Sequence, residues 1–233
     1  MDIQQFRYGA DNLGYLVYGE KSSIAIDPGA PEEMAKFASE RNISIDIVTN
    51  THTHADHTQG NNALVKRTNA RFIDCTTLLH GQVLDLKDAS GLEVMLTPGH
   101  TMDSLCFKGD GFIVTGDTLF NATVGNCFSG DLEAFFNSLK QLMVLSGDTL
   151  VYAGHDYVLD SLKYAKIIEP DNPNLNEYAA AYNPDHVVSR LSDEFKVNPY
   201  LRFNASSMIE RLKEKNLPRE TQFQRFSSVM EVF

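Results

Sequence analysis

The sequence THTHADH, residues 51–57, places His52, His54, Asp56 and His57 within six positions. Neutral imidazole and carboxylate groups are the ligands that zinc, iron and manganese take in proteins. A short apolar run ends just before this stretch and predicts a buried strand that delivers the chain to the first histidine. The stretch therefore predicts a metal site built on a loop at the end of a strand.

Three later segments repeat this arrangement of a short apolar run followed by a candidate ligand. They are TPGHT with His100, TGDT with Asp117, and AGHD with His155. Ligands that follow four separate strands are expected to meet at one edge of a layered sheet. The seven side chains together suffice for two metal ions if one carboxylate bridges them.

The alternative is that these histidines are structural, which is how we interpret the isolated His80 and His186. The chain has seven histidines, however, and five of them lie in the segments just described. Each of these segments also contains turn-forming Gly, Asp or Thr, which mark loops at strand ends. The clustering therefore favours a metal centre over a set of unrelated structural histidines.

These motifs resemble those of the metallo-β-lactamase superfamily of metallohydrolases, and within it those of glyoxalase II, the hydroxyacylglutathione hydrolases. The resemblance covers most of the chain. The metal motifs carry the superfamily likeness, and the last two segments of the following series favour the glyoxalase II branch. The matching segments are IDPG (26–29), THTHADH followed by Gly60-Asn61, TPGHT (97–101), TGDTLF (115–120), GHDY (154–157), EP (169–170) and NPYLR (198–202).

The fold that this resemblance implies is α/β, a four-layered αββα metallo-β-lactamase sandwich with a small C-terminal helical region. We expect the catalytic domain at residues 1–168 and the helical, substrate-side region at residues 169–233. Strand-like runs continue to residue 153, and helical text divided by prolines follows from about residue 158. The expected helices are 31–41, 61–68, 131–145, 159–168, 206–215 and 221–232; a hairpin is expected around Gly19-Glu20-Lys21, and a strand over 71–74.

The chemistry follows from the family's ligand assignment. By resemblance, one divalent ion is held by His52, His54 and His100, the other by Asp56, His57 and His155, with Asp117 as the bridge. We expect zinc, with iron or manganese as the alternatives. Two such ions lower the pKa of a shared water, and the resulting metal-bridging hydroxide attacks a thioester carbonyl. Asp56 and Asp117 are therefore the expected catalytic carboxylates of a binuclear metal-dependent hydrolase.

Asp27 has two interpretations. It is either a carboxylate that orients a ligand histidine, or a turn residue before Pro28-Gly29. A serine nucleophile is not expected, since the chain has no G-x-S-x-G segment.

The substrate side departs from the family. Glyoxalase II enzymes resemble one another in a Gly-Cys-Gly-Lys/Arg-Phe-Tyr-like stretch whose basic residue and tyrosine hold glutathione. Here Asn126 stands in place of the basic residue and Phe128 in place of the tyrosine. Tyr157 matches the family's tyrosine after the last ligand histidine, and Arg225 is the nearest candidate for a late basic residue. These four are the expected substrate-binding residues, and thioester hydrolysis is better supported than glutathione as the thiol carrier.

Other functions remain open on the sequence. One is a persulfide dioxygenase-like enzyme with a single iron held by two histidines and one aspartate, which the text around Ala55 also resembles. Another is hydrolysis of an ester or thioester that does not contain glutathione. A non-catalytic binding module is disfavoured because the ligand set is complete. The number of metal ions discriminates among these functions.

The composition of the chain excludes some classes of binding partner. The net charge of −11, from 20 basic and 31 acidic side chains, argues against a nucleic-acid substrate. No apolar run approaches 18 residues, and the N-terminus lacks an apolar signal segment, so neither a membrane span nor a signal peptide is expected. Three widely spaced cysteines favour reduced thiols in the cytoplasm. The expected partner is a small-molecule thioester, and the oligomeric state is not predicted.

Overall fold

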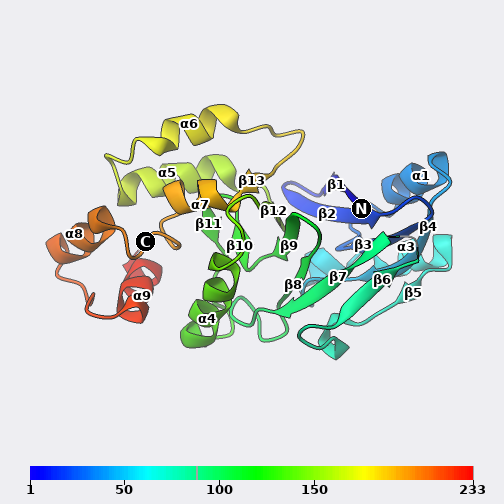
Figure 1. The fold of residues 1–233 in the computed structure, drawn as a ribbon, viewed down its shortest axis with the longest axis horizontal. Helices are drawn as coiled ribbons and strands as arrows, with labels where there is room; N and C mark the ends of the chain where they lie inside the picture. The colour runs from blue at the N-terminus through cyan, green and yellow to red at the C-terminus, as the bar shows by residue number, and fades with distance from the viewer. Residues whose placement is uncertain (88, 233) are drawn as a thin grey trace.

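The computed structural model describes residues 1–87 and 89–232, and its first half contains a five-stranded sheet (Figure 1). The strand order is β1-β2-β3-β4-β5; the first three strands pair antiparallel, whereas β3, β4 and β5 pair parallel. The strands are β1 (Asp2–Tyr8), β2 (Asn12–Tyr18), β3 (Ser22–Ile26), β4 (Ser44–Thr49) and β5 (Arg71–Phe72). The helices of this half are α1 (Pro31–Glu40), α2 (Ala55–Thr58), α3 (Asn61–Thr68) and the short 3-10 helix η1 (Cys75–Thr77).

The second sheet has six strands in the order β13-β12-β9-β8-β7-β6. β12 runs parallel to β9, and its other neighbour, β13, runs antiparallel. A two-stranded ribbon, β10-β11, lies beside this sheet. The strands are β6 (Val83–Leu86), β7 (Ala89–Leu96), β8 (Leu105–Lys108), β9 (Phe112–Gly116), β10 (Leu119–Phe120), β11 (Thr123–Val124), β12 (Leu150–Ala153) and β13 (Ser189–Arg190).

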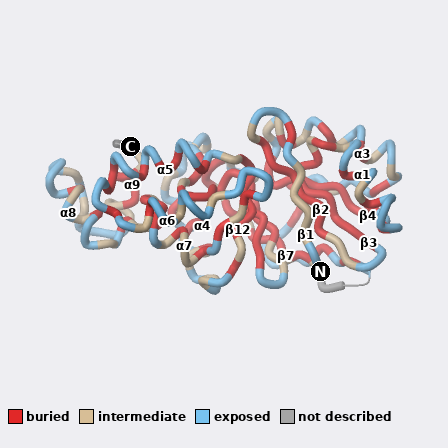
Figure 2. Tube along the Cα trace, turned by 90° about the horizontal axis from the view of Figure 1, so that it is seen from above, coloured by how far each residue is buried: buried red, intermediate tan, exposed pale blue. Residues whose placement is uncertain are grey.

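Successive side chains of a strand point to opposite faces of its sheet and so pack in different cores. In β2, Leu13, Tyr15 and Val17 belong to the large core between the two sheets, whereas Leu16 faces the opposite way. Leu16 packs in a second core with Met34 of α1 and with residues of α3 and β4. Helix α4 (Leu132–Met143) covers the outer face of the other sheet in a third core. Three cores between four layers confirm the predicted αββα sandwich, and Figure 2 shows the buried strands running between exposed helix surfaces.

The C-terminal part is helical. The helices that follow β12 are α5 (Val158–Ile168), α6 (Asn174–Ala181), α7 (Leu191–Val197), α8 (Ser206–Glu214) and α9 (Gln222–Val232), and α5 lies within the expected catalytic domain. An ion pair joins the end of α5 to the segment before α8. The partly exposed Arg202 guanidinium donates to both carboxylate oxygens of the buried Glu169, at 2.7 and 3.0 Å. Among the described residues, no helix is both long and apolar enough to cross a membrane.

Most predicted elements lie within two residues of the observed ones. The helix expected over residues 131–145 is α4, and Asp131 caps its N-terminus, since Asp131 Oδ1 accepts from the Ala134 amide at 2.9 Å. One strand prediction was too long: β5 ends at Phe72, not at Asp74. Asp74 instead caps η1, with its carboxylate accepting from the Thr76 amide at 2.9 Å, and a residue engaged in this way leaves the strand pairing.

Candidate metal centre

All seven predicted ligands lie together at one edge of the two sheets. The segment after β4 and the short helix α2 present the first four, and the loops after β7, β9 and β12 present the other three. Within this set, ligand atoms lie within 4.8 Å of one another in two clusters. The first cluster contains His52, His54, His100 and Asp117, and the second contains Asp56, His57 and His155.

Three imidazole nitrogens converge in the first cluster. His54 Nδ1 lies 3.0 Å from Nε2 of His52 and 3.1 Å from Nε2 of His100. His100 Nδ1 lies 2.9 Å from the Asn126 carbonyl oxygen, and a carbonyl only accepts, so the proton is on Nδ1. The Nε2 lone pair of His100 therefore points into the cluster, as a metal ligand requires.

The second cluster brings two imidazoles together in the same way. His57 Nδ1 donates to Asp27 Oδ2 at 3.0 Å, and His155 Nδ1 donates to Asp11 Oδ1 at 2.7 Å. Their Nε2 atoms face each other at 3.3 Å, and Asp56 Oδ2 lies 3.4 Å from Nε2 of His155. Two lone pairs at this distance need a proton or a metal cation between them.

Asp117 lies between the clusters. Its Oδ2 is 3.5 Å from Nε2 of both His100 and His155. Its Oδ1 is buried and accepts no hydrogen bond, although His57 Nε2 lies 3.3 Å away without hydrogen-bond geometry. A buried acceptor without a donor costs about 1–3 kcal/mol, which a coordinated cation offsets. The donor set therefore fits two divalent cations that share this carboxylate.

The backbone approaches Asp117 closely at Gly154. A Cβ atom on Gly154 would lie 2.2 Å from Asp117 Oδ1, so a side chain at this position would displace the carboxylate. The glycine of the sequence segment AGHD is thus required by the centre.

The electrostatics of the cluster suit metal binding. Burial, reinforced by the nearby His57, lowers the pKa of His52 to about 4, so this imidazole is neutral. Burial alone would raise the pKa of Asp117, but His57, His155 and His52 outweigh it and hold that pKa well below its usual range. A neutral imidazole and an ionised carboxylate are the ligand forms that bind metal.

His57 carries the proton that a cation replaces. Burial lowers its pKa, but the carboxylates of Asp27 and Asp117 outweigh burial and raise the pKa to about 11. Metal binding at this place therefore releases a proton.

Asp27 orients imidazoles of both clusters. It is fully buried, and it accepts from the Thr51 amide and the Thr51 hydroxyl, each at 2.8 Å. Because the hydroxyl donates to Asp27, it accepts from His52 Nδ1 at 3.1 Å. The carboxylate that bonds His57 directly thus also reaches His52 through one hydroxyl.

Sequence reasoning missed Asp11, Asn12 and Thr51. Asn12 Nδ2 donates to Asp56 Oδ2 at 2.9 Å, and Asp11 bonds His155. The sequence GADN, residues 9–12, is typical of an ordinary turn, and the residues that Asn12 and Asp11 contact lie 44 and 144 positions away along the chain. Thr51 adjoins the histidine motif, and a hydroxyl directly before the first ligand is the one local signal.

The predicted substrate residues fall into two groups. The Phe128 ring lies 5.9 Å from that of His54 and 5.2 Å from that of His100, and the side chain is 66% exposed. The Tyr157 ring stacks on His155 at 4.9 Å with an angle of 8° between the planes. Asn126 is exposed and contributes its backbone carbonyl to His100. These three therefore lie at the clusters.

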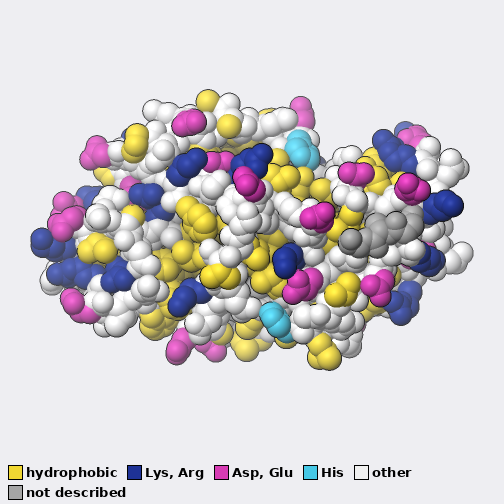
Figure 3. All heavy atoms as spheres, viewed as in Figure 1, with side chains coloured by type: hydrophobic (Ala, Val, Ile, Leu, Met, Phe, Trp, Pro, Cys, Tyr) yellow, Lys and Arg dark blue, Asp and Glu magenta, His cyan; other side chains and the backbone are white. Residues whose placement is uncertain are grey.

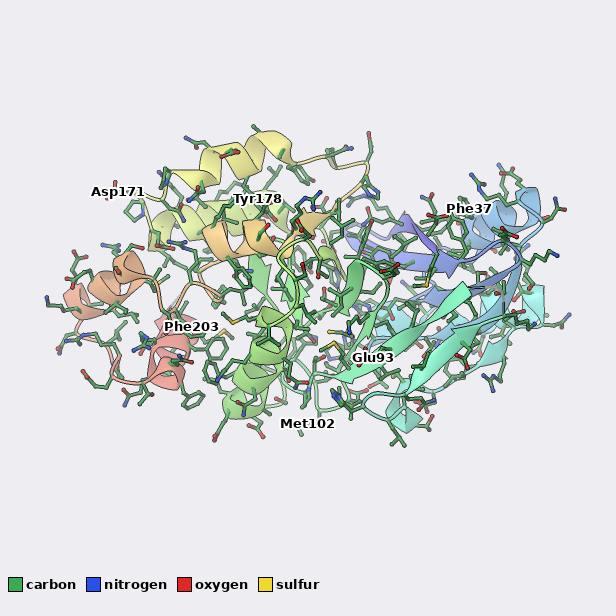
Figure 4. The ribbon with its side chains drawn as sticks, in the orientation of Figure 1. Phe37, Glu93, Met102, Asp171, Tyr178 and Phe203 are labelled. Atoms are coloured by element: carbon green, nitrogen blue, oxygen red, sulfur yellow. The ribbon has the colours of Figure 1, made fainter. Side chains whose placement is uncertain are left out.

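Arg225 lies elsewhere, on α9. Its guanidinium donates to Asn204 Oδ1 at 2.7 and 3.0 Å and to the Arg219 carbonyl at 2.7 Å. Within the described part of the chain, none of the hydrogen-bond partners of Arg225 belongs to either cluster of predicted metal ligands. In Figure 3 Lys and Arg side chains lie at both ends of the molecule, including the end formed by α8. Met102, labelled in Figure 4, is 63% exposed on the loop that carries His100.

Two family models divide the chain between them. The model described as Metallo-beta-lactamase superfamily matches residues 11–73 and 76–155. The model described as Hydroxyacylglutathione hydrolase C-terminus matches residues 156–231. The matched ranges contain all seven predicted ligands.

Individual proteins are similar over nearly the whole chain. The hydroxyacylglutathione hydrolase of Chromohalobacter salexigens is 33% identical over 224 residues, which cover 88% of each chain. That of Polaromonas sp. is 34% identical over 236 residues, which cover 90% of this chain and 89% of the other. The crystal structure of ETHE1 from Myxococcus xanthus shares the fold, with a TM-score of 0.71 at 24% identity over 98% of this chain and 100% of that chain. These matches confirm the resemblance predicted from the sequence: the chain belongs to the metallo-β-lactamase superfamily and, within it, to the hydroxyacylglutathione hydrolase family.

Proposed function

We propose that this protein is a binuclear metal-dependent hydrolase that cleaves thioesters of the hydroxyacylglutathione type. The family assignment supports metal-dependent thioester hydrolysis. The observation that supports two ions is the position of Asp117, buried between two imidazole clusters with one carboxylate oxygen unpaired. Zinc is the proposed metal, with iron or manganese as the alternatives.

The proposed mechanism assigns separate tasks to the residues. His52, His54 and His100 would hold one ion, Asp56, His57 and His155 would hold the other, and both would share Asp117. Two such ions would supply a water of lowered pKa and would polarise a carbonyl. Asp56 is kept ionised, because the amide of Asn12 and the nearby His57 lower its pKa against the opposing effect of burial.

No side-chain nucleophile is proposed. The hydroxyl of Thr51 is within reach of His52, but it already donates to Asp27, so His52 cannot take its proton. We therefore expect no covalent acyl-enzyme, and its detection by mass spectrometry during turnover would contradict the mechanism.

The substrate side is proposed to be largely uncharged. Phe128 covers two imidazoles of the first cluster, and Tyr157 covers His155 of the second. Burial raises the pKa of Tyr157 to about 12, and the further contributions come from the carboxylates of Asp11, Asp117 and Asp56. Asn126 and Phe128 offer no charge-assisted contact to the carboxylates of glutathione, so we propose that less anionic thioesters are cleaved at least as well.

Three further assignments complete the proposal. The catalytic domain is placed at residues 1–168 and the helical substrate-side region at 169–233. The three cysteines are unpaired, which favours a reducing, cytoplasmic compartment.

The decisive experiment is elemental analysis of the purified protein together with a thioester panel. The proposal predicts two metal equivalents per chain and hydrolysis of S-lactoylglutathione or a smaller thioester. One iron per chain, with oxygen uptake in the presence of a persulfide and no thioester cleavage, would instead establish the dioxygenase alternative. A protein that binds no metal would contradict both functions.

A further inference from the structure

The two clusters differ in what supports their imidazoles. In the first, the outer nitrogen of His100 donates to a backbone carbonyl, and that of His52 donates to the Thr51 hydroxyl. In the second, the outer nitrogens of His57 and His155 both donate to carboxylates. A carboxylate behind a ligand imidazole raises its basicity and fixes its orientation. The two metal positions are therefore not equivalent.

One of the two supporting carboxylates acts on a single cluster. Asp27 contacts His57 directly and reaches His52 through Thr51, so it does not distinguish the clusters. Among the predicted ligands, Asp11 bonds His155 alone, at 2.7 Å. A change at Asp11 therefore tests the second cluster without direct contact with the first.

The backbone holds Asp11 against His155. The Asp156 amide donates to the Asp11 carbonyl at 2.9 Å, and the Leu13 amide donates to the Gly154 carbonyl at 2.8 Å. Between these two bonds, residues 12 and 155 pair as an isolated antiparallel bridge. The turn between β1 and β2 is thus bonded on both sides of His155, and the Asp11 carboxylate is presented from a fixed position.

Charge adds to this asymmetry. The second cluster contains the carboxylate of Asp56, and its imidazoles contact those of Asp11 and Asp27 directly. Among the described residues of the first cluster, the one carboxylate ligand is the shared Asp117, while Asp27 reaches His52 only through Thr51 and Asp103 accepts from the Thr53 amide. Attraction between unlike charges favours a divalent ion at the more anionic position. We propose that Asp11 is a positioning residue that holds His155 and makes the Asp56 cluster the tighter of the two metal positions. This inference rests on the proposed dinuclear centre, but not on the identity of the substrate.

The test is a chelator titration of the zinc-loaded, full-length protein, with the retained zinc counted by elemental analysis. The wild type is expected to lose its two equivalents in two steps. In Asp11→Ala the second zinc equivalent should be removed at a chelator concentration about 10- to 100-fold lower than in the wild type. The first equivalent should be removed at an unchanged concentration. Asp11→Asn keeps an acceptor of the same shape without the charge. Its later step should fall at a chelator concentration between those of the wild type and Asp11→Ala. Asp160→Asn removes an exposed carboxylate that pairs with Lys163, and should move neither step.

Each outcome has a separate meaning. A wild type that never holds two equivalents contradicts the proposed dinuclear centre. Two equivalents with an unmoved later step in Asp11→Ala contradict the role of Asp11, and a shift of the earlier step overturns the ranking of the two positions. Cobalt(II) spectra of the same variants give an independent readout: Asp11→Ala should alter the signal of one bound ion and leave that of the other. A shift of both steps together would indicate general destabilisation, which thermal unfolding of the metal-free variants would show directly, and it would overturn the positioning role.

Discussion

The metal centre and the substrate side adjoin each other, but they are built in different ways. His57 is fully buried and bonded to a buried carboxylate, so the fold fixes its orientation. Phe128, whose ring contacts that of His100 in the first cluster, is 66% exposed. In the proposed function, the packing of both sheets therefore fixes the residues of the metal centre, whereas substrate choice is assigned to a few exposed side chains. Such side chains change at little cost to stability.

The largest effect that this comparison predicts comes from the shared carboxylate. Asp117→Ala should remove at least one metal equivalent and lower thioester hydrolysis by at least about 100-fold, because both clusters lose the group between them. Elemental analysis and initial rates on the same preparation measure both. A variant that keeps two equivalents and near-normal rates would show that Asp117 does not bridge.

A smaller loss is expected at the carboxylate that orients both clusters. In Asp27→Asn an amide group replaces one of two accepting oxygens. At the Oδ2 position it leaves both His57 Nδ1 and the Thr51 hydroxyl without their acceptor, and at the Oδ1 position it leaves the Thr51 amide without one. Metal retention should weaken about 10- to 100-fold at both positions. The chelator titration separates this result from that of Asp11, and a shift of one step alone would mean that the link through Thr51 to His52 carries no weight.

The substrate side should respond selectively and more modestly. Asn126→Lys combined with Phe128→Tyr restores a cation and a phenol, and a charge-assisted contact contributes about 1.5–3 kcal/mol, or roughly 10- to 100-fold in binding. KM for S-lactoylglutathione should fall by up to that factor, with little change for a thioester that lacks glutathione. Asn126→Met combined with Phe128→Tyr is the matched control, since it lengthens the side chain without charge. Saturation of the native enzyme at low micromolar S-lactoylglutathione would show that another residue already supplies the contact.

The smallest effect on activity is expected at Arg225. Its guanidinium is engaged by Asn204 and by backbone carbonyls, so Arg225→Ala should change KM by less than about threefold while destabilising α9 by about 1–3 kcal/mol. Steady-state kinetics and thermal unfolding measure the two effects. A tenfold rise in KM for the glutathione thioester alone would place Arg225 at the substrate, as the family resemblance implies.

The same contrast explains what the sequence could predict. The ligands lie in short local motifs, and the strands before them are apolar runs, so both could be identified from neighbouring residues. β1 was missed because it is a partly exposed edge strand rich in polar residues, DIQQFRY, whose pairing with β2 alone makes it a strand. Helices α6 and α7 were missed because prolines divide the text around them. The contact between Asp11 and His155 spans 144 residues and leaves no local pattern.

The division of the ligands between the two sheets has a consequence for folding. His52 follows β4 of one sheet, and His155 follows β12 of the other. Cations that bind both sets therefore act as a reversible cross-link and close a long loop, in a chain whose three cysteines form no disulfide. Because ligand binding to the folded state alone adds RT ln(1 + [L]/Kd) to stability, the free metal concentration sets how firmly the two sheets stay together. Removal of the metal would then make the chain more susceptible to proteolysis and would also abolish its hydrolytic activity.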